Sequence, residues 1–189
     1  MEFAEVVAAV RYGARNLFRF SGRDSRRLFW PFSLCVFGLV YVLTTALAQA
    51  IVLQGMLQIY DASQRGGNAA GQAFAETFAR MEALWIPYAI SEALAVLLLA
   101  AAVTRRLHDR GWSGAWGLIP LPFLVLATIG MPGAFDGAMA RVQDPGELQG
   151  LLFLAGPLGF AALVGLGVLL ALQGTPGPNR YGTATREMP

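Results

Sequence analysis

The chain has 189 residues, of which 56% are hydrophobic and only 14% are charged. A soluble domain carries about 25% charged residues, so the composition excludes an ordinary soluble protein and indicates the membrane class. The net charge of +2 is too small to indicate a nucleic-acid partner. The length predicts a single membrane domain over residues 1–189.

Residues 1–20 have the pattern of an amphipathic helix. At 100° per residue, the apolar side chains fall within an arc of about 120°, and arginines at spacing four lie beside that arc. The apolar positions are Phe3, Val6, Val7, Val10, Ala14, Leu17 and Phe18, and the basic ones are Arg11, Arg15 and Arg19. The pattern favours an interfacial helix with its arginines toward anionic headgroups. The alternative is a helix that packs on the end of the bundle.

Four apolar runs follow, each close to the roughly 20 residues that a helix needs to cross a bilayer. We predict an all-α integral membrane protein with four transmembrane helices, at about residues 29–53, 84–103, 115–131 and 151–172. Pro120 and Pro122 predict a kink or a late start in the third helix. The sequence Ala48-Gln49-Ala50 has the form of a signal-peptide cleavage site, but the apolar run is too long for one, so we expect a retained helix.

Arginine-rich and arginine-poor segments alternate between these runs. The rich segments precede the first run, join the second to the third and follow the fourth; they contain Arg11, Arg15, Arg19, Arg23, Arg26, Arg27, Arg105, Arg106, Arg110, Arg180 and Arg186. The other two connections contain only Arg65, Arg80 and Arg141, together with acidic residues. The positive-inside rule therefore predicts that both termini and the 105–114 connection are cytoplasmic.

Three segments carry a family resemblance. They read FSGRDSRRLFW at residues 20–30, TRRLHDRGWSG at 104–114 and GTPGPNRYG at 174–182. Together they resemble the YhaH-like bacterial inner-membrane proteins, defined by domain of unknown function 805, over about residues 16–183. The resemblance implies a small helical protein of the bacterial cytoplasmic (inner) membrane without an established biochemical activity. The chain departs from the family pattern at Leu28, where an acid is usual, and at Ala115, where tryptophan is usual.

The three segments are predicted to share one cytoplasmic surface. We hypothesise that arginines surround His108 and Asp109 there and bind a phosphate or lipid headgroup, because guanidinium groups match phosphate oxygens. The arginines in question are Arg23, Arg26, Arg105, Arg106 and Arg180. Asp109 is expected to pair with one of them or with an imidazole that the fold brings near. The alternative, which these residue types favour, is a structural hinge, in which Gly111 supplies a positive φ and Ser113 caps the next helix.

Glu92 lies near the middle of the second apolar run, where a charge is costly. Counting about 1.5 Å per residue from the cytoplasmic ends places four hydroxyl side chains at a similar depth. They are Tyr41, Thr44, Thr45 and Thr128. We expect an interhelical hydrogen bond between Glu92 and one of them. The alternative is a proton or cation path.

Motifs of hydrolases, metalloproteases, phosphate-binding loops and dinucleotide-binding folds are absent from the sequence. Cys35 and His108 are the only cysteine and histidine, too few for a metal site. We therefore expect a non-enzymatic protein with no metal and no cofactor. Its predicted role is to bind lipid headgroups or a protein partner through the arginine-rich face, with a homo-oligomer left open. The alternative is a small transporter or channel that uses Glu92.

Overall fold

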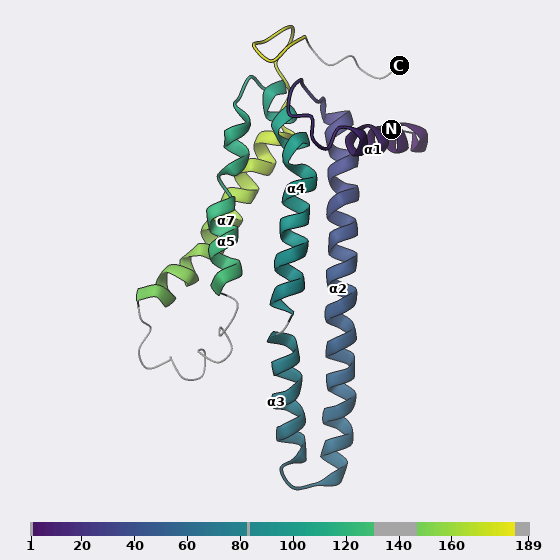
Figure 1. Ribbon diagram of the computed structural model, residues 1–189, viewed down its shortest axis with the longest axis vertical. Helices are drawn as coiled ribbons and strands as arrows, with labels where there is room; N and C mark the ends of the chain where they lie inside the picture. Colours follow the sequence, from purple (N-terminus) through teal and green to yellow (C-terminus); the bar gives the residue numbers. More distant parts are fainter. Residues whose placement is uncertain (1, 83, 131–146, 184–189) are drawn as a thin grey trace.

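The computed structural model describes residues 2–82, 84–130 and 147–183. Helices dominate this part of the chain, whose only β-type pairing is an isolated bridge between Asn179 and Gly182. The prediction of an all-α protein is confirmed at this level. The N-terminus, the connection after α4 (Trp85–Asp109) and the segment that follows α7 (Glu147–Ala171) lie at one end of the molecule (Figure 1).

The N-terminal helix, α1 (Phe3–Arg15), lies across the end of the much longer α2 (Arg26–Arg65), as Figure 1 shows. The helix is shorter than the predicted 1–20. It ends because the Asn16 side-chain amide donates a hydrogen bond to the Tyr12 carbonyl at 2.8 Å and satisfies a carbonyl of the last turn. Phe18, predicted to continue the apolar face, lies beyond the helix and is 90% exposed.

The first long helix continues well beyond its predicted end at residue 53, since α2 has 40 residues and ends at Arg65. At about 1.5 Å per residue it is about 60 Å long, roughly twice the thickness of the hydrocarbon core. The extension is helical because α3 (Ala69–Glu82) turns back and packs on it. Gly55 approaches Thr77 of α3 closely, and Ala62 is buried.

The third and fourth predicted spans correspond to a broken helix and a continuous one. A 3₁₀ turn, η1 (Gly114–Leu118), comes before α5 (Leu121–Gly130), so the regular helix starts late. The break falls at Ile119 and Pro120, and Pro122 lies in the first turn of α5, where a proline's missing N–H does not interrupt the helix. The late start of the helix agrees with the prediction. Residue 131, the predicted end of this span, lies outside the described residues. The predicted fourth span, 151–172, lies within α7 apart from Leu172, and α7 begins four residues earlier, at Glu147.

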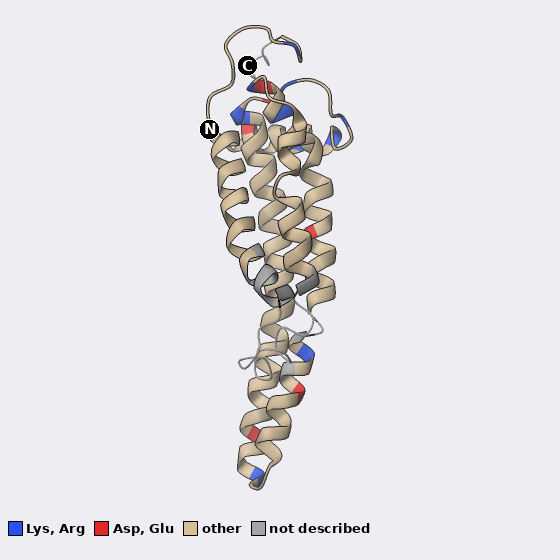
Figure 2. Ribbon diagram, turned by 90° about the vertical axis from the view of Figure 1, so that its left-hand side faces the viewer, with Lys and Arg blue, Asp and Glu red and all other residues tan. Residues whose placement is uncertain are grey.

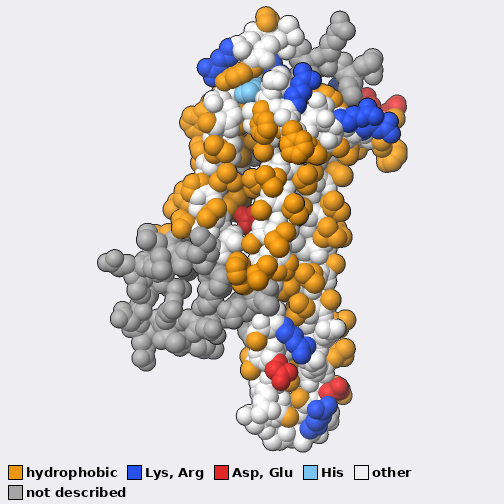
Figure 3. Space-filling model, viewed as in Figure 1, with side chains coloured by type: hydrophobic (Ala, Val, Ile, Leu, Met, Phe, Trp, Pro, Cys, Tyr) orange, Lys and Arg blue, Asp and Glu red, His pale blue; other side chains and the backbone are white. Residues whose placement is uncertain are grey.

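Apolar surface covers the middle of the molecule, and charged residues gather toward its ends (Figures 2 and 3). Two segments, Arg26–Arg65 and Ala69–Asp109, each contain a stretch long and apolar enough to cross a membrane, and these two stretches have mean hydropathies of 2.1 and 2.0. Only 6% of the residues in the first stretch and 17% of those in the second are buried. A core helix of a soluble fold would be mostly buried, so these helices are of another kind. The shorter apolar helices are Gly114–Thr128 and Gly156–Ala171. These properties are those of a membrane protein.

The buried core lies at the end of the molecule that carries the termini. It joins the start of α2, the last turns of α4 and the end of α7, through Phe29, Phe32, Val36, Leu99, Ala102, Leu107 and Leu170. At the opposite end of the described helices, α2 and α3 pack on each other, and no residue of α3 belongs to this core. The core thus joins the first two segments that carry the family resemblance to α7, the helix that precedes the third.

Helix α1 packs on α2 at Gly13, where no space remains for a larger side chain. A Cβ atom at Gly13 would lie 2.2 Å from Cγ of Phe32, whose ring is buried in the core. Gly13→Ala should therefore lower the free energy of unfolding by about 1–3 kcal/mol, the range for overpacking. Thermal unfolding in detergent measures the change.

Gly38→Ala is the matched control, because a Cβ atom there would meet nothing within 4 Å and the position is inside α2. We expect no loss of stability in this variant, since alanine favours a helix over glycine. A Gly13→Ala variant as stable as Gly38→Ala would contradict the close seating of α1.

Candidate functional site

The three segments at residues 20–30, 104–114 and 174–182 meet in one hydrogen-bonded cluster at the end of the helices. Asp24 N–H donates to the Arg105 carbonyl at 3.2 Å, which joins the first segment to the second. Thr175 N–H donates to the Asp109 carbonyl at 2.9 Å, which joins the second to the third. Segments more than 60 residues apart in the chain therefore form one structural unit.

Asp109 lies at the centre of this cluster, between two arginines. Its Oδ1 accepts from Nε of Arg23 at 3.1 Å, and Nη2 of Arg23 lies 3.0 Å from the same oxygen. Its Oδ2 accepts from Nη1 of Arg106. Both ion pairs are buried, so their strength depends on complete hydrogen bonding rather than on charge alone. Asp109 thus pairs with two of the predicted arginines.

Arg106 joins α4 to the end of α7. Its Nε donates to the Leu170 carbonyl at 2.9 Å, and its Nη2 donates to the Leu172 carbonyl. The last carbonyls of a helix lack partners within the helix and carry a partial negative charge. The last turn of α7 contains no basic residue of its own, so Arg106 of α4 supplies the missing positive charge and donors.

Arg23 performs a similar task for the segment after α7. Its Nη1 donates to the Gly177 carbonyl at 2.7 Å, and its Nη2 donates to the Thr175 carbonyl at 2.8 Å. These bonds fold residues 174–182 back over the end of α4. Asn179 strengthens the arrangement, because its Nδ2 donates to the His108 carbonyl at 2.9 Å.

Arg105 makes a separate buried pair, with Asp24. Nε of Arg105 donates to Oδ2 of Asp24 at 2.8 Å, and Nη1 donates to the Asn16 carbonyl at 2.8 Å. Oδ1 of Asp24 accepts from the Tyr12 hydroxyl at 3.1 Å. Burial raises the pKa of Asp24, and the neighbouring Arg105 opposes that rise. Burial, together with the charge of Asp24, also raises the pKa of Tyr12, so the phenol stays protonated and donates.

His108 faces the outer surface of the cluster rather than its centre. Its ring stacks on Tyr181 with a centroid separation of 3.8 Å and an interplanar angle of 7°. Nδ1 of His108 lies 3.3 Å from the Gly22 carbonyl, and the guanidinium of Arg180 lies 4.7 Å from the Tyr181 ring centre. His108 therefore bridges the first and third segments by packing and hydrogen bonding.

The hinge features predicted for residues 105–114 are present. Gly111 has a φ of 75°, which other residues rarely adopt, and it reverses the chain after α4. The Ser113 side chain accepts from the Ala115 N–H at 3.3 Å at the start of η1. These residues accordingly have structural roles.

Three arginines of the hypothesised ligand cluster lie inside the fold. Arg23, Arg105 and Arg106 are only 6%, 1% and 0% exposed, and their side-chain nitrogens, apart from Nη2 of Arg105, donate to partners inside the chain. Their burial argues against direct contact with a lipid headgroup. Arg26 and Arg180, the other two predicted arginines, are exposed. The sequence patterns did not identify five other residues of the cluster as part of it, although the last four belong to the segments that carry the family resemblance. They are Tyr12, Asp24, Thr175, Asn179 and Tyr181.

Arg26 and its neighbour Arg27 form the exposed basic site at this end. They line a recess of about 820 Å³ together with Val6 and Val10 of α1 and Trp30 and Leu34 of α2, among others. They also line a smaller cavity of about 250 Å³ that Ser25, Arg106, Asp109 and Gly174 complete. Within the described residues, neither Arg26 nor Arg27 makes a side-chain hydrogen bond or an ion pair. Two guanidiniums that pair with no other described side chain thus line an otherwise apolar recess.

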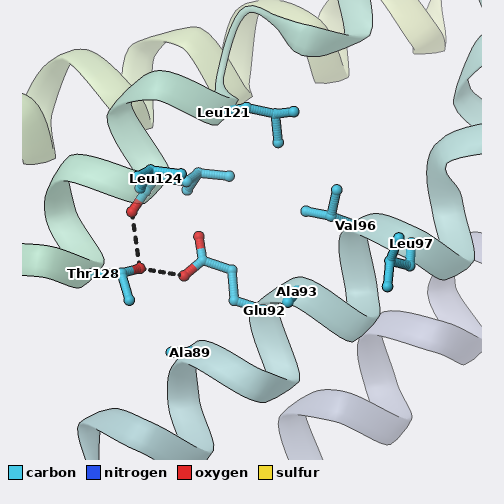
Figure 4. Close-up of a pocket in the computed structure, with 9 residues that line it drawn as sticks. Ala89, Glu92, Ala93, Val96, Leu97, Leu121, Leu124 and Thr128 are labelled. Carbon is cyan, nitrogen blue, oxygen red and sulfur yellow. Dashed lines mark hydrogen bonds between the residues drawn. The ribbon is translucent and has the colours of Figure 1, made fainter.

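Glu92 forms the interhelical hydrogen bond that its depth predicts. The Thr128 hydroxyl, on α5, donates to Oε2 of Glu92 on α4 at 2.8 Å (Figure 4). Of the four hydroxyl residues at similar depth, the two threonines of α2 instead donate to carbonyls of their own helix. Among the residues that the structure describes, no group of three or more His, Cys, Asp or Glu is placed to hold a metal ion.

An all-helical architecture with an apolar belt, closed at one end by buried arginine–aspartate pairs, defines a helical membrane protein. The chain belongs to the family described as "Protein of unknown function (DUF805)", whose profile matches residues 17–183. All three segments of the cluster lie within that match. Comparisons with curated proteins and with solved structures gave no match.

Proposed function

We propose that this protein is a small, non-enzymatic protein of the bacterial inner membrane that binds anionic lipid headgroups at its cytoplasmic face through Arg26 and Arg27. The single observation that carries the proposal is the recess lined by α1 and the start of α2, in which two guanidiniums without a described partner are set among apolar side chains. An anionic lipid has the matching chemistry, because its phosphate suits arginine and its acyl chain suits the apolar wall.

The proposed topology has four transmembrane helices, with both termini in the cytoplasm. It rests on the alternation of arginine-rich and arginine-poor segments, and on the location of α1, the start of α2 and the segment after α7 at one end of the fold. In this topology α1 lies in the membrane interface. Ala9 and Gly13 are buried, whereas Phe3 is 84% exposed and available to the acyl region.

The arginines of this face have two different tasks in the proposal. Arg23, Arg105 and Arg106 hold the three segments together from inside, whereas Arg26 and Arg27 remain available to a ligand. The N-terminus of α2 adds unpaired backbone N–H groups at the same place, which favours an anion. The proposal therefore moves the predicted headgroup site from the His108–Asp109 centre to the start of α2.

Lipid retained after purification in native lipid discs tests this proposal. We expect the wild-type protein to retain anionic phospholipid and the Arg26→Gln/Arg27→Gln variant to retain about tenfold less, because each charged phosphate contact contributes about 1 kcal/mol or more. Mass spectrometry of the extracted lipid measures the headgroup and the amount.

The matched control is Arg65→Gln/Arg80→Gln, which removes the same charge from the α2–α3 hairpin at the other end. It should retain lipid like the wild type. Equal retention by both double variants would refute the assignment to Arg26 and Arg27. Recovery of a protein partner in place of lipid would contradict lipid binding and support the alternative that the arginine-rich face binds a protein.

The second candidate function, a small transporter or channel that uses Glu92, has narrower support. Within the described part of the chain, the polar groups beside Glu92 amount to one hydroxyl, from Thr128. A path for ions or protons needs a succession of such groups through the membrane. Proton-coupled flux in vesicles that disappears in Glu92→Gln would favour this candidate.

A further inference from the structure

A second cavity lies away from the arginine cluster, between α4 and α5. Its volume is about 420 Å³, within the range of about 300–1,000 Å³ typical of small-molecule sites. Its lining includes Ala89, Glu92 and Ala93 from α4 and Leu121, Leu124 and Thr128 from α5 (Figure 4). All of its other lining residues are aliphatic. One carboxylate and one hydroxyl are thus set in an otherwise apolar recess. It is open on one side, where Leu97 and Val125 are 67% and 55% exposed, and we call it the chamber.

The arrangement of the helices explains why the chamber exists. Helix α4 packs along α2, and α5 packs along α7, whereas α4 and α5 make little direct contact. Ala89 and Ala93 occupy the face of α4 that also carries Glu92, and their small side chains leave space where larger residues would reach α5. The Thr128–Glu92 hydrogen bond bridges the two pairs of helices across this space.

The carboxylate retains an oxygen that can serve a ligand. Oε2 of Glu92 accepts the Thr128 hydroxyl, whereas Oε1 accepts no hydrogen bond among the described residues and is directed into the chamber (Figure 4). Within the same part of the chain, no arginine forms an ion pair with Glu92. A negative charge in apolar surroundings is strongly favoured when a cation accompanies it.

We propose that this chamber binds a lipophilic monovalent cation, of the quaternary ammonium or phosphonium type, with its charge beside Glu92 and its hydrocarbon groups against the aliphatic wall. Charge complementarity excludes anions, and the aliphatic wall offers no donors for a heavily hydroxylated solute. The site is independent of the lipid site at Arg26 and Arg27. It needs no passage through the membrane, so it also differs from the transporter alternative.

Equilibrium dialysis of radiolabelled tetraphenylphosphonium tests the proposal with the full-length protein in lipid discs. This probe has a permanent positive charge and an apolar body, and empty discs give its partition into lipid. We expect saturable binding to the wild type above that background. Glu92→Gln should weaken this binding at least about tenfold, because it removes the charge with little change in shape.

Two further variants separate ligand binding from folding. Ala93→Leu keeps the carboxylate but fills the chamber, so it should also weaken binding at least about tenfold. Glu76→Gln is the matched control, since it neutralises an exposed acid on α3, and it should bind like the wild type.

Thermal unfolding shows which variants are folded, and if Glu92→Gln fails to fold, Ala93→Leu decides the result. Wild-type binding no greater than that of empty discs would overturn the proposal. So would unchanged affinity in a folded Glu92→Gln variant or, where that variant does not fold, in Ala93→Leu.

Discussion

Replacing Asp109 by asparagine should lower the free energy of unfolding by about 3–5 kcal/mol, the range for removing one partner of a buried ion pair. Asp109 accepts from both Arg23 and Arg106, whose side chains are almost fully buried. Asparagine has nearly the same shape but no charge, so two guanidiniums would lose their common counter-ion. The N–H₂ group of the asparagine would also face the N–H donors of one of the two arginines, where an acceptor is needed. Chemical or thermal unfolding in detergent measures the loss.

Asp61→Asn gives the matched control for this prediction, because Asp61 is exposed on α2 and makes no ion pair among the described residues. We expect a change within about 0.5 kcal/mol, as for other surface substitutions. If Asp109→Asn is as stable as Asp61→Asn, then Asp109 is not the centre of the cluster and the lipid-binding interpretation of His108 and Asp109 regains support.

Periodicity and composition suffice to predict the class of this fold, since apolar runs of about 20 residues dominate the chain. Arginine distribution also groups the three family segments at one end, where the structure brings them into contact. For Glu92, counting the rise per residue along each helix narrows the possible hydrogen-bond partners but does not identify the partner. It selects four hydroxyl residues, one of which, Thr128, is the partner. The α2 threonines donate their hydroxyl hydrogen bonds to carbonyls of their own helix. The sequence does not indicate which of the four hydroxyls bonds to Glu92.

The inward orientation of Arg23, Arg105 and Arg106 is not readable from the sequence. An arginine near the end of a membrane helix satisfies the positive-inside rule whether it faces solvent or the interior. Most of the acceptors that hold these side chains inside are backbone carbonyls, of Leu170, Thr175 and Gly177 among others. Backbone acceptors leave no trace in a pattern of side-chain types, and their positions depend on how α4 and α7 pack.

Helix α2 extends past the predicted end of the first membrane span for a related reason. Residues 54–65 include Gln54, Gln58 and Asp61, and this polarity indicates the end of a membrane span. It does not indicate the end of a helix, because α3 packs on this extension and buries Ala62. A hydropathy pattern reports the boundary of the apolar layer, whereas tertiary contact decides where helical structure continues.

The second large effect is expected at Arg105, which ties the α1–α2 connection to α4. Arg105→Met should lower the free energy of unfolding by about 3–5 kcal/mol, because Asp24 would remain buried with only the Tyr12 hydroxyl as a side-chain partner. The methionine fills a similar volume, so the loss reports the missing charge and donors rather than a cavity. Unfolding in detergent measures it.

The double variant Arg105→Met/Asp24→Leu distinguishes the ion pair from the other contacts of Arg105. Replacing both partners of a buried pair by apolar groups is often close to neutral, so the double variant should recover at least about half of the loss. Full recovery is not expected, because the Asn16 and Arg19 carbonyls lose their donor in both variants. If the double variant is no more stable than Arg105→Met, these carbonyl contacts, and not the pairing with Asp24, fix the connection in place. In that case the function of Asp24 has to be sought elsewhere.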